Sequence, residues 1–277
     1  MNETWICQRL FEASLQAGVV ALAMQKDIVN EGKEVEPQEG EDMHHLAMRQ
    51  AKTKVDVMVQ DMLLSALRHV RDELKLDVEE ESEYLGLFPN EKAEYSLVID
   101  PIDGTLDYLH QKDTYSICSA LIRDGDMKAV VVYFPKQDML YCYEPQLGAR
   151  YFSCAHLCSW EDGTRIAFEG DGNHLVYKND RVKENLIKRF VDNGCEVLDD
   201  RISNCPKALL ACMKKDALCY LCDTRNIRDI LMGAILSKCK DGAILDEMGE
   251  TVTWPSCGRL PFGIFTRFPE KIKKILK

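Results

Sequence analysis

The chain has 277 residues, of which 46% are hydrophobic and 29% are charged, a composition that suits a globular protein with a sizeable core. Its 46 acidic residues exceed the 35 basic ones, which gives a formal net charge of −11. Such a surface repels phosphate backbones, and no Lys/Arg-rich run offsets it, so nucleic acid is not an expected partner.

The same reading predicts no membrane partner, since the longest apolar run, Ala17 to Met24, is too short to cross a bilayer. The N-terminal stretch MNETWICQRLFEASL lacks the basic and apolar regions of a secretory signal, which favours a cytoplasmic location. We therefore expect the twelve cysteines to be free thiols. Cys219 and Cys222 could form half of a zinc site, but their apolar surroundings favour buried small side chains.

Two helices are predicted at the start of the chain. Phe11, Leu15, Val19 and Leu22 recur at helical spacing. The segment 29–42 is acidic and contains Gly and Pro, so we expect a mobile loop there. A second helix is predicted over 55–70, where Asp56 lies at the start of the apolar stripe.

Short strands follow and then alternate with helices. Runs at 96–99, 115–122, 127–134, 139–143 and 149–152 are typical of strands. Beyond them we expect helices over 180–192, 204–215 and 227–239 and strands over 196–198, 218–222 and 243–245. This pattern predicts an α+β first half and an α/β second half. A single domain would contain both lobes, with a boundary near residues 153 and 154.

The most specific motif is DPIDGT at 100–105, which directly follows an apolar strand. Because proline cannot donate to a strand ladder, we expect the strand to end there and the turn to bring Asp100 and Asp103 together. The carbonyl of Ile102 lies between them in sequence. Two carboxylates and a carbonyl form a hard oxygen site that suits Mg²⁺. Gly104 and Thr105 would open a helix whose N–H groups can hold phosphate.

Two more acidic residues could complete the site. Glu80 lies in VEEES, twenty residues before Asp100, and Asp229 opens a predicted helix. Taken alone, the first could belong to a solvated acidic run and the second could complement a helix dipole.

Together these motifs resemble the inositol monophosphatase family of lithium-sensitive, Mg-dependent phosphatases, whose superfamily also includes fructose bisphosphatase and 3′-phosphoadenosine 5′-phosphate phosphatase. DPIDGT matches the family signature, VEEES resembles its Gly-Glu-Glu-Ser motif, and RDILMGAIL is similar to its C-terminal Trp-Asp motif. The resemblance implies a layered αβαβα sandwich and hydrolysis of a phosphate monoester with two or three Mg²⁺ ions. It also implies a homodimer.

The resemblance implies a role for each matching residue. One Mg²⁺ ion would activate a water molecule whose proton passes to Thr105, oriented by Asp56, and a second would stabilise the leaving group. The catalytic residues would be Thr105, Asp56 and Glu80; the metal ligands Glu80, Asp100, Ile102, Asp103 and Asp229; and the substrate contacts Asp103, Gly104, Thr105, Ser203, Asn204, Cys205, Arg228 and Asp229.

The substrate-binding residues match less well than the metal ligands. The family's inositol-binding glutamate falls on Cys222, whose thiol cannot accept hydrogen bonds from two hydroxyl groups as a carboxylate does. The neighbouring Asp223 would face the other side of the strand. Arg225 and Arg228 could bind a second phosphate or could simply offset the acidic cluster. Arg201 and Lys207 are further candidates for anion binding.

Three functions therefore stay open. The first is hydrolysis of inositol monophosphate or a similar polyol or sugar phosphate. The second is hydrolysis of a bisphosphate, either 3′-phosphoadenosine 5′-phosphate or fructose bisphosphate. The third is a non-catalytic family member that binds metal or a partner through its fold. The small-molecule partner would in the first two cases be a phosphorylated metabolite.

Overall fold

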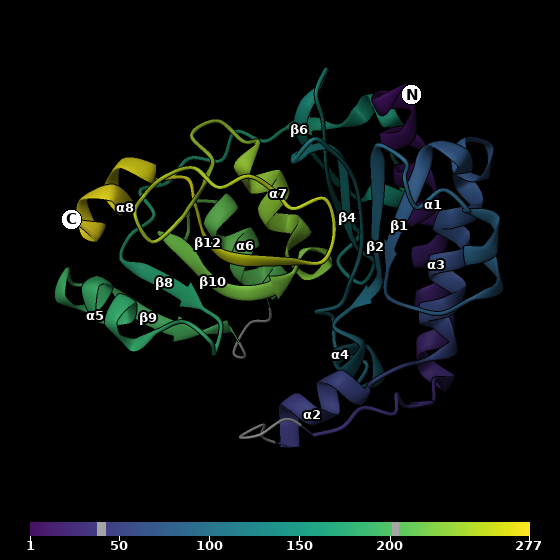
Figure 1. The fold of residues 1–277 in the computed structure, drawn as a ribbon, viewed down its shortest axis with the longest axis horizontal. Helices are drawn as coiled ribbons and strands as arrows, with labels where there is room; N and C mark the ends of the chain where they lie inside the picture. Colours follow the sequence, from purple (N-terminus) through teal and green to yellow (C-terminus); the bar gives the residue numbers. More distant parts are fainter. Residues whose placement is uncertain (38–42, 201–204) are drawn as a thin grey trace.

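Five layers of helices and sheets make up the molecule in the computed structural model, which describes residues 1–37, 43–200 and 205–277. In Figure 1 the helices α1 and α3 lie on the outer face of one sheet, α6 and α7 lie between the two sheets, and α5 and α8 lie beyond the second sheet. This arrangement confirms the expected αβαβα sandwich, with mixed sheets flanked by helices.

The first sheet contains seven strands in the order β1-β2-β3-β4-β5-β6-β7. The pair β1–β2 is parallel and the following pairs are antiparallel, so β2 to β7 form a meander. Its strands are β1 (Leu74–Val78), β2 (Tyr95–Asp103), β3 (Ser116–Arg123), β4 (Asp126–Phe134), β5 (Met139–Glu144), β6 (Gly148–Ser153) and β7 (Thr164–Arg165).

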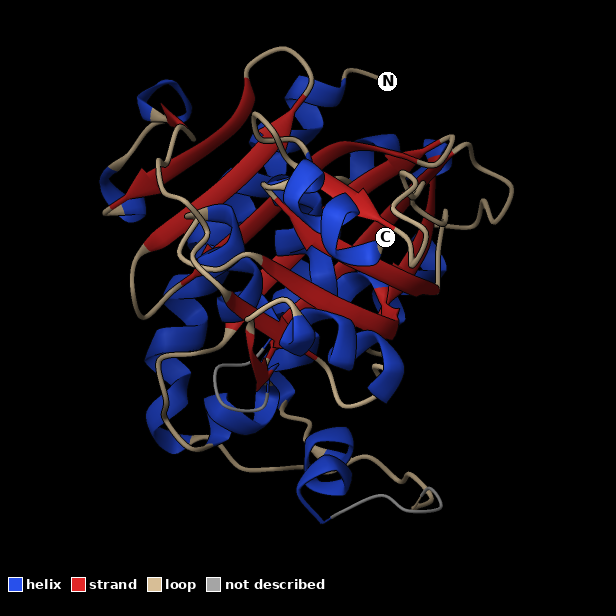
Figure 2. Ribbon diagram, turned by 90° about the vertical axis from the view of Figure 1, so that its left-hand side faces the viewer, coloured by secondary structure: helices blue, strands red, loops and turns tan. Residues whose placement is uncertain are grey.

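The second sheet contains five strands in the order β11-β12-β10-β8-β9. Parallel pairing joins β10, β8 and β9, and β12 pairs antiparallel with both β10 and β11. Its strands are β8 (Leu175–Lys178), β9 (Glu196–Asp199), β10 (Cys219–Asn226), β11 (Ala243–Leu245) and β12 (Arg259–Thr266). Figure 2 shows the strands of both sheets together with the helices that cover them.

Eight α-helices lie in the described residues. They are α1 (Glu3–Met24), α2 (Met43–Gln50), α3 (Lys54–Ala66), α4 (Thr105–Leu109), α5 (Glu184–Asp192), α6 (Cys205–Met213), α7 (Leu231–Ser237) and α8 (Pro269–Leu276). Short 3₁₀ turns connect several elements, and the one called η7 (Ile227–Ile230) directly precedes α7. No helix of the described residues is long and apolar enough to span a bilayer.

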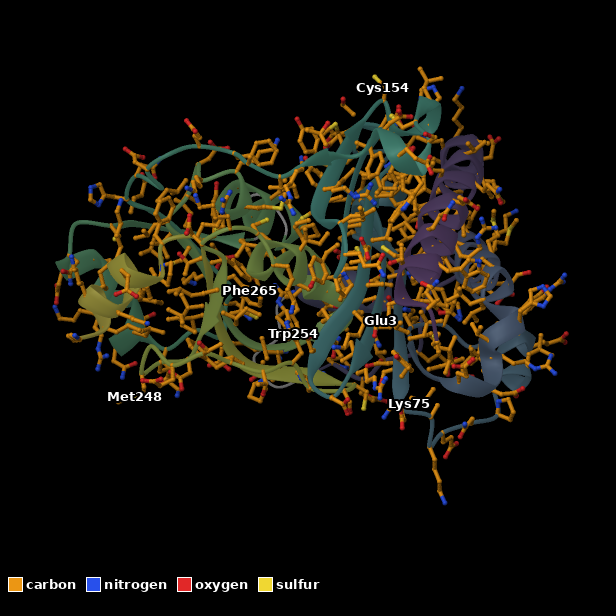
Figure 3. The ribbon with its side chains drawn as sticks, turned by 90° about the horizontal axis from the view of Figure 1, so that it is seen from above. Glu3, Lys75, Cys154, Met248, Trp254 and Phe265 are labelled. Atoms are coloured by element: carbon orange, nitrogen blue, oxygen red, sulfur yellow. The ribbon has the colours of Figure 1, made fainter. Side chains whose placement is uncertain are left out.

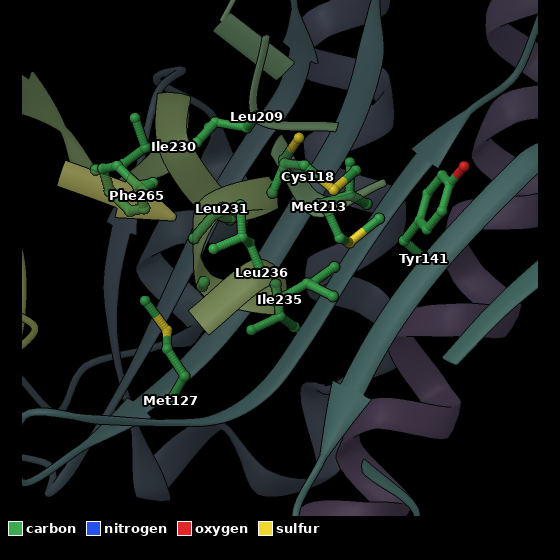
Figure 4. Packing of buried hydrophobic residues seen from close by; sticks show 14 of the residues in the cluster. Cys118, Met127, Tyr141, Leu209, Met213, Ile230, Leu231, Ile235, Leu236 and Phe265 are labelled. Carbon is green, nitrogen blue, oxygen red and sulfur yellow. The ribbon is translucent and has the colours of Figure 1, made fainter. Parts of the chain in front are cut away.

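The central core lies between the two sheets, around α6 and α7. Figure 4 shows Leu231, Ile235 and Leu236 of α7 packed toward strands of the first sheet, and each is almost fully buried. Phe265 of the second sheet joins the same cluster. In Figure 3 it lies near Trp254, and the two ring centroids are 6.1 Å apart. Because α7 is apolar on all sides, it suits this interior position.

Three expectations from the sequence were wrong. Helix α1 forms, but Val19 is 62% exposed because the helix packs through small residues, including Ala17 and Gly18. β2 does not end at Pro101 but continues to Asp103. The segment 29–42 packs in part, since Lys33 forms ion pairs with Glu79 and Glu80; residues 38–42 lie outside the described residues.

Gly18 permits the close approach of α1 to β4. A Cβ atom built at Gly18 would lie 2.3 Å from the ring of Tyr133, which is 2% exposed. Replacing Gly18 with Ala usually favours a helix, but here the methyl group requires either the helix or the buried ring to move.

We therefore expect Gly18→Ala to lower the free energy of unfolding by about 1–3 kcal/mol, measured by urea denaturation. Gln16→Ala is the matched control, because Gln16 is exposed on the same helix. If Gly18→Ala is as stable as Gln16→Ala, the packing of α1 on β4 is not as described.

Candidate functional site

A bulge at the end of β2 positions the two motif aspartates. Asp100 pairs with Cys118 and Asp103 pairs with Ser116, so three steps along β2 match two along β3. Pro101 lies within this irregular stretch, where its missing N–H breaks no regular ladder bond. The extra residue turns β2 toward α4 and leaves Asp103 partly exposed, whereas Asp100 is only 3% exposed.

Gly104 connects the bulge to α4. Its φ of +93° belongs to the left-handed region, which favours glycine. The next residue, Thr105, starts the helix, and its hydroxyl lies 3.0 Å from the carbonyl oxygen of Ile102 and 3.1 Å from Oδ1 of Asp56. A hydroxyl has one proton, so Thr105 donates to one of these acceptors at a time.

Asp56 is fixed at the start of α3. Its Oδ2 accepts hydrogen bonds from the backbone N–H and the hydroxyl of Thr53, which completes a capping box. Its Oδ1 faces Thr105. Burial raises the pKa of Asp56 to about 6, with further contributions from the charges of Glu80 and Glu79, although the bonds from Thr53 oppose the rise.

Asp229 approaches the same place from the second half of the chain. It lies in η7, which contacts β2 and β3, rather than in the first turn of an α-helix as predicted. Burial raises the pKa of Asp229 to about 6, although Arg225 and Arg228 oppose the rise. The pKa values of Asp100 and Asp103 are also raised, mainly by burial; for Asp100 the charges of Glu79, Asp103 and Asp229 add to this.

Two arginines lie beside this group of aspartates. Arg225 donates to Asp200 over 2.5 Å, and Tyr220 donates to the same Oδ2 atom over 2.8 Å. Arg228 lies 3.5 Å from Asp77 of β1. Both arginines oppose the rise in the pKa of Asp229, so their charges also act on the aspartates.

Glu80 has a different environment. The backbone N–H and carbonyl of Glu80 both bond to the side-chain amide of Gln60. Its carboxylate is 2% exposed, with Lys33 Nζ 2.6 Å from Oε1 and Lys52 Nζ 2.9 Å from Oε2. Two ammonium groups therefore face the carboxylate that the resemblance assigned to a metal.

The donor chemistry of the three aspartates fits a divalent cation. Oδ1 of Asp100 is buried and has no hydrogen-bond partner, which is costly for an ionised oxygen. A hard cation such as Mg²⁺ would satisfy it with Asp103 and Asp229. Oε1 of Glu80 is also buried without a hydrogen bond of regular geometry, but Lys33 and Lys52 lie beside this carboxylate and offset its charge. Across the described ranges, no three His, Cys, Asp or Glu side chains form a ready-made metal group.

The structure places the other predicted site residues as follows. Cys205 and Cys222 are buried, and Asp223 accepts a hydrogen bond from Thr224 over 2.7 Å. Lys207 lies 3.7 Å from Asp113, so it already has an anionic partner. The predictions for Arg201, Ser203 and Asn204 fall outside the described residues.

Three residues near the site were missed in the sequence. Asp200 follows β9 and holds Arg225, and the acidic doublet at the end of a predicted strand could have indicated it. Lys33 and Lys52 gave no usable signal, because each is a single lysine in an irregular segment. Their role depends on a contact with Glu80 that only the folded chain shows.

The chain matches a known protein family. The model of the inositol monophosphatase family matches residues 8–260, which is nearly the whole chain. A putative Nus factor SuhB of Neisseria meningitidis is 33% identical over 95 residues, and an inositol-1-monophosphatase of Mesorhizobium japonicum is 30% identical over 97 residues. Each match covers about a third of this chain (34% and 35%) and 35% of the relative.

Solved structures support the fold. An IMPase/NADP phosphatase complexed with Mg²⁺ and phosphate aligns with a TM-score of 0.67 at 17% sequence identity. The alignment covers 94% of this chain and 90% of that one. At this identity the likeness concerns the fold.

If the aspartates bind Mg²⁺, the ion should stabilise the folded chain. We expect 10 mM Mg²⁺ (roughly a hundred times a Kd of ~0.1 mM) to add about 2.7 kcal/mol to the free energy of unfolding. Asp100→Asn should lose most of this gain in a thermal-shift assay. Asp124→Asn, on an exposed turn, is the control and should respond like the wild type. An equal Mg²⁺ response in Asp100→Asn would contradict the assignment.

Proposed function

Because this chain belongs to the inositol monophosphatase family, we propose that it is an Mg²⁺-dependent phosphatase that hydrolyses a small phosphate monoester. The observation that carries the proposal is the hydrogen-bonded pair of Thr105 and Asp56 beside the aspartates of the β2 bulge. A proton acceptor and a buried group of hard oxygen donors are the parts that such a hydrolysis needs.

The proton path follows from the contacts of Thr105. A water molecule beside the Thr105 hydroxyl can pass its proton to Oγ1 while the hydroxyl proton moves to Oδ1 of Asp56, 3.1 Å away. The capping box holds the Asp56 carboxylate in the orientation that this transfer needs. Asp56 must be ionised to accept the proton. No covalent intermediate is required.

Asp100, Asp103 and Asp229 would hold the divalent cation, together with the Ile102 carbonyl when Thr105 donates to Asp56. When bound, the cation supplies Lewis acidity and neutralises charge on the phosphate and the leaving oxygen. The backbone N–H groups of Gly104 and Thr105 would orient phosphate oxygens. The number of ions stays a prediction.

The first substrate class is inositol monophosphate or a similar polyol or sugar phosphate, as the family name suggests. The second is a bisphosphate, which two features favour: the charges of Arg225 and Arg228 act on Asp229, and the buried Cys222 falls where the resemblance expects the inositol-binding glutamate. A second phosphate would compete with Asp200 for Arg225 and with Asp77 for Arg228. A guanidinium group suits a second phosphate. A structural relative is an IMPase/NADP phosphatase, whose name includes a nucleotide substrate.

Three further proposals concern assembly, location and a non-catalytic role. The homodimer and the cytoplasmic location are carried over as predictions from the sequence. A non-catalytic role is the third candidate, because one curated relative is a putative Nus factor. It is disfavoured by the presence of Thr105, Asp56 and the three aspartates, since a family member without activity has no need to keep them.

A panel of phosphate esters tests the proposed function. We expect phosphate release with Mg²⁺ from at least one member of a panel of inositol monophosphate, glycerol phosphate, sugar phosphates, 3′-phosphoadenosine 5′-phosphate and fructose bisphosphate, each also assayed with Li⁺. If a bisphosphate is the substrate, Arg228→Ala should reduce its kcat/KM about tenfold more than that of a monophosphate, because a charge-assisted hydrogen bond contributes ~1.5–3 kcal/mol.

Asp100→Asn is the control for contaminating phosphatases. Release by the wild type no faster than by Asp100→Asn on every ester would overturn the enzymatic proposal. If Mg²⁺ nevertheless binds, that result would favour the non-catalytic role.

The raised pKa of Asp56 predicts a pH dependence. Asp56 accepts a proton only when ionised, so kcat should fall as the pH drops below its pKa of about 6. Asp56→Asn should lose about 10²-fold or more in kcat. At saturating Mg²⁺, which keeps Asp229 ionised although burial raises its pKa to about 6 as well, the residual activity should not show this acid limb between pH 5 and 7. Asp61→Asn, on the same helix, is the control and should keep the limb. The same acid limb in Asp56→Asn would assign it to another group.

A further inference from the structure

Glu80 lies in a cluster of two lysines and two glutamates at the edge of the site. Lys33 Nζ lies 2.6 Å from Oε1 of Glu79 and 2.6 Å from Oε1 of Glu80. Lys52 Nζ lies 2.9 Å from the other oxygen, Oε2, of Glu80. Among the side chains that the structure describes, two ammonium groups and two carboxylates give this cluster a formal charge of zero.

The lysines are held there by the backbone. Two segments lie side by side: the N–H of Glu31 donates to the carbonyl of Lys52, and the N–H of Lys33 donates to the carbonyl of Gln50, each over 2.8 Å. The side chain of Asn30 accepts from the N–H groups of Gly32 and Lys52, each over 3.1 Å. This connection fixes Lys33 and Lys52 on adjacent backbones, so both reach Glu80 together.

Glu80 itself cannot turn away easily. Gln60 of α3 holds its backbone from both sides, with distances of 2.9 Å to the N–H and 2.6 Å to the carbonyl. The carboxylate is 2% exposed, and the side chains of Lys33 and Lys52 are 22% and 24% exposed. An exposed ion pair contributes little, but removing one partner of a buried pair is costly. Because the Glu80 carboxylate is buried, removing its lysine partners would be costly.

A divalent cation at Glu80 would have to overcome this arrangement. It would add two positive charges to a cluster that is already neutral, and it would lie beside two ammonium groups that contact the same carboxylate. The group formed by Asp100, Asp103 and Asp229 has no lysine contact of this kind among the ion pairs of the described residues. The two parts of the site therefore differ in their affinity for cations.

We propose that Lys33 and Lys52 take the place of a divalent cation at Glu80, so that the metal is bound by the group of Asp100, Asp103 and Asp229 and not by Glu80. The lysines supply the positive charge that balances the Glu80 carboxylate where a cation would otherwise do so. The inference rests on the proposed function only because that function identifies Glu80 as part of a metal-dependent site. It predicts fewer bound Mg²⁺ ions than the two or three that the family resemblance implies.

Calorimetric titration of Mg²⁺ into the metal-free chain tests the proposal without any substrate. The double variant Lys33→Met/Lys52→Met should bind one more ion per chain than the wild type, with an affinity at Glu80 at least about tenfold above that of the wild type, because two repelling charges are gone. The additional ion should disappear when Glu80→Gln is added. Lys54→Met, an exposed lysine beside the cluster, should bind Mg²⁺ like the wild type.

Equal stoichiometry and affinity in the wild type and the double variant would overturn the proposal. If the double variant does not fold, Mn²⁺ soaked into wild-type crystals replaces it: anomalous density near Asp100 alone supports the proposal, and density at Glu80 overturns it. Both measurements are independent of turnover. An inactive chain would contradict the proposed function and leave this inference standing.

Discussion

The repulsion among buried carboxylates is the constraint on which the site depends. Burial raises the pKa values of Asp100 and Asp103; the charges of Asp103 and Asp229 add to the rise for Asp100, and that of Asp229 adds to the rise for Asp103. Oδ1 of Asp100 is buried without a hydrogen-bond partner. Burying an ionised group costs on the order of several kcal/mol unless an opposite charge lies beside it. The fold keeps this arrangement although it is unfavourable in the isolated chain, which is typical of a site that binds a cation.

The layered fold explains how residues distant in sequence meet there. β2 ends in a bulge beside β3, and η7, from the second half of the chain, contacts both of these strands. The helix α7 that follows η7 packs between the two sheets, with Leu231 and Ile235 almost fully buried. Asp229 is thus fixed by the central core, and Asp56 is fixed by the cap of α3 on the other face of the first sheet.

The sequence predicted those parts of the site that depend on local chemistry. DPIDGT indicated that Asp100 and Asp103 lie together and that a helix starts at Thr105, since proline and glycine restrict the backbone at these positions. The strand was expected to stop at Pro101, but a bulge accommodates proline without ending the strand. Lys33, Lys52 and Asp200 were missed because they act through long-range ion pairs. Val19 was misplaced because small residues, which carry little hydrophobic signal, form the contact face of α1.

The positive charges around the aspartates are arranged in two unequal groups. Lys33 and Lys52 contact the carboxylate of Glu80 directly, whereas Arg228 lies 3.5 Å from Asp77 and Arg225 contacts Asp200. A phosphate entering the site carries negative charge that the aspartates alone would repel. Each of these lysines and arginines is paired with a carboxylate, so together they offset acidic charge around the site but leave the charge of the three aspartates to a cation. In a chain of net charge −11, a cation at the three aspartates would therefore be needed before a phosphate could approach them.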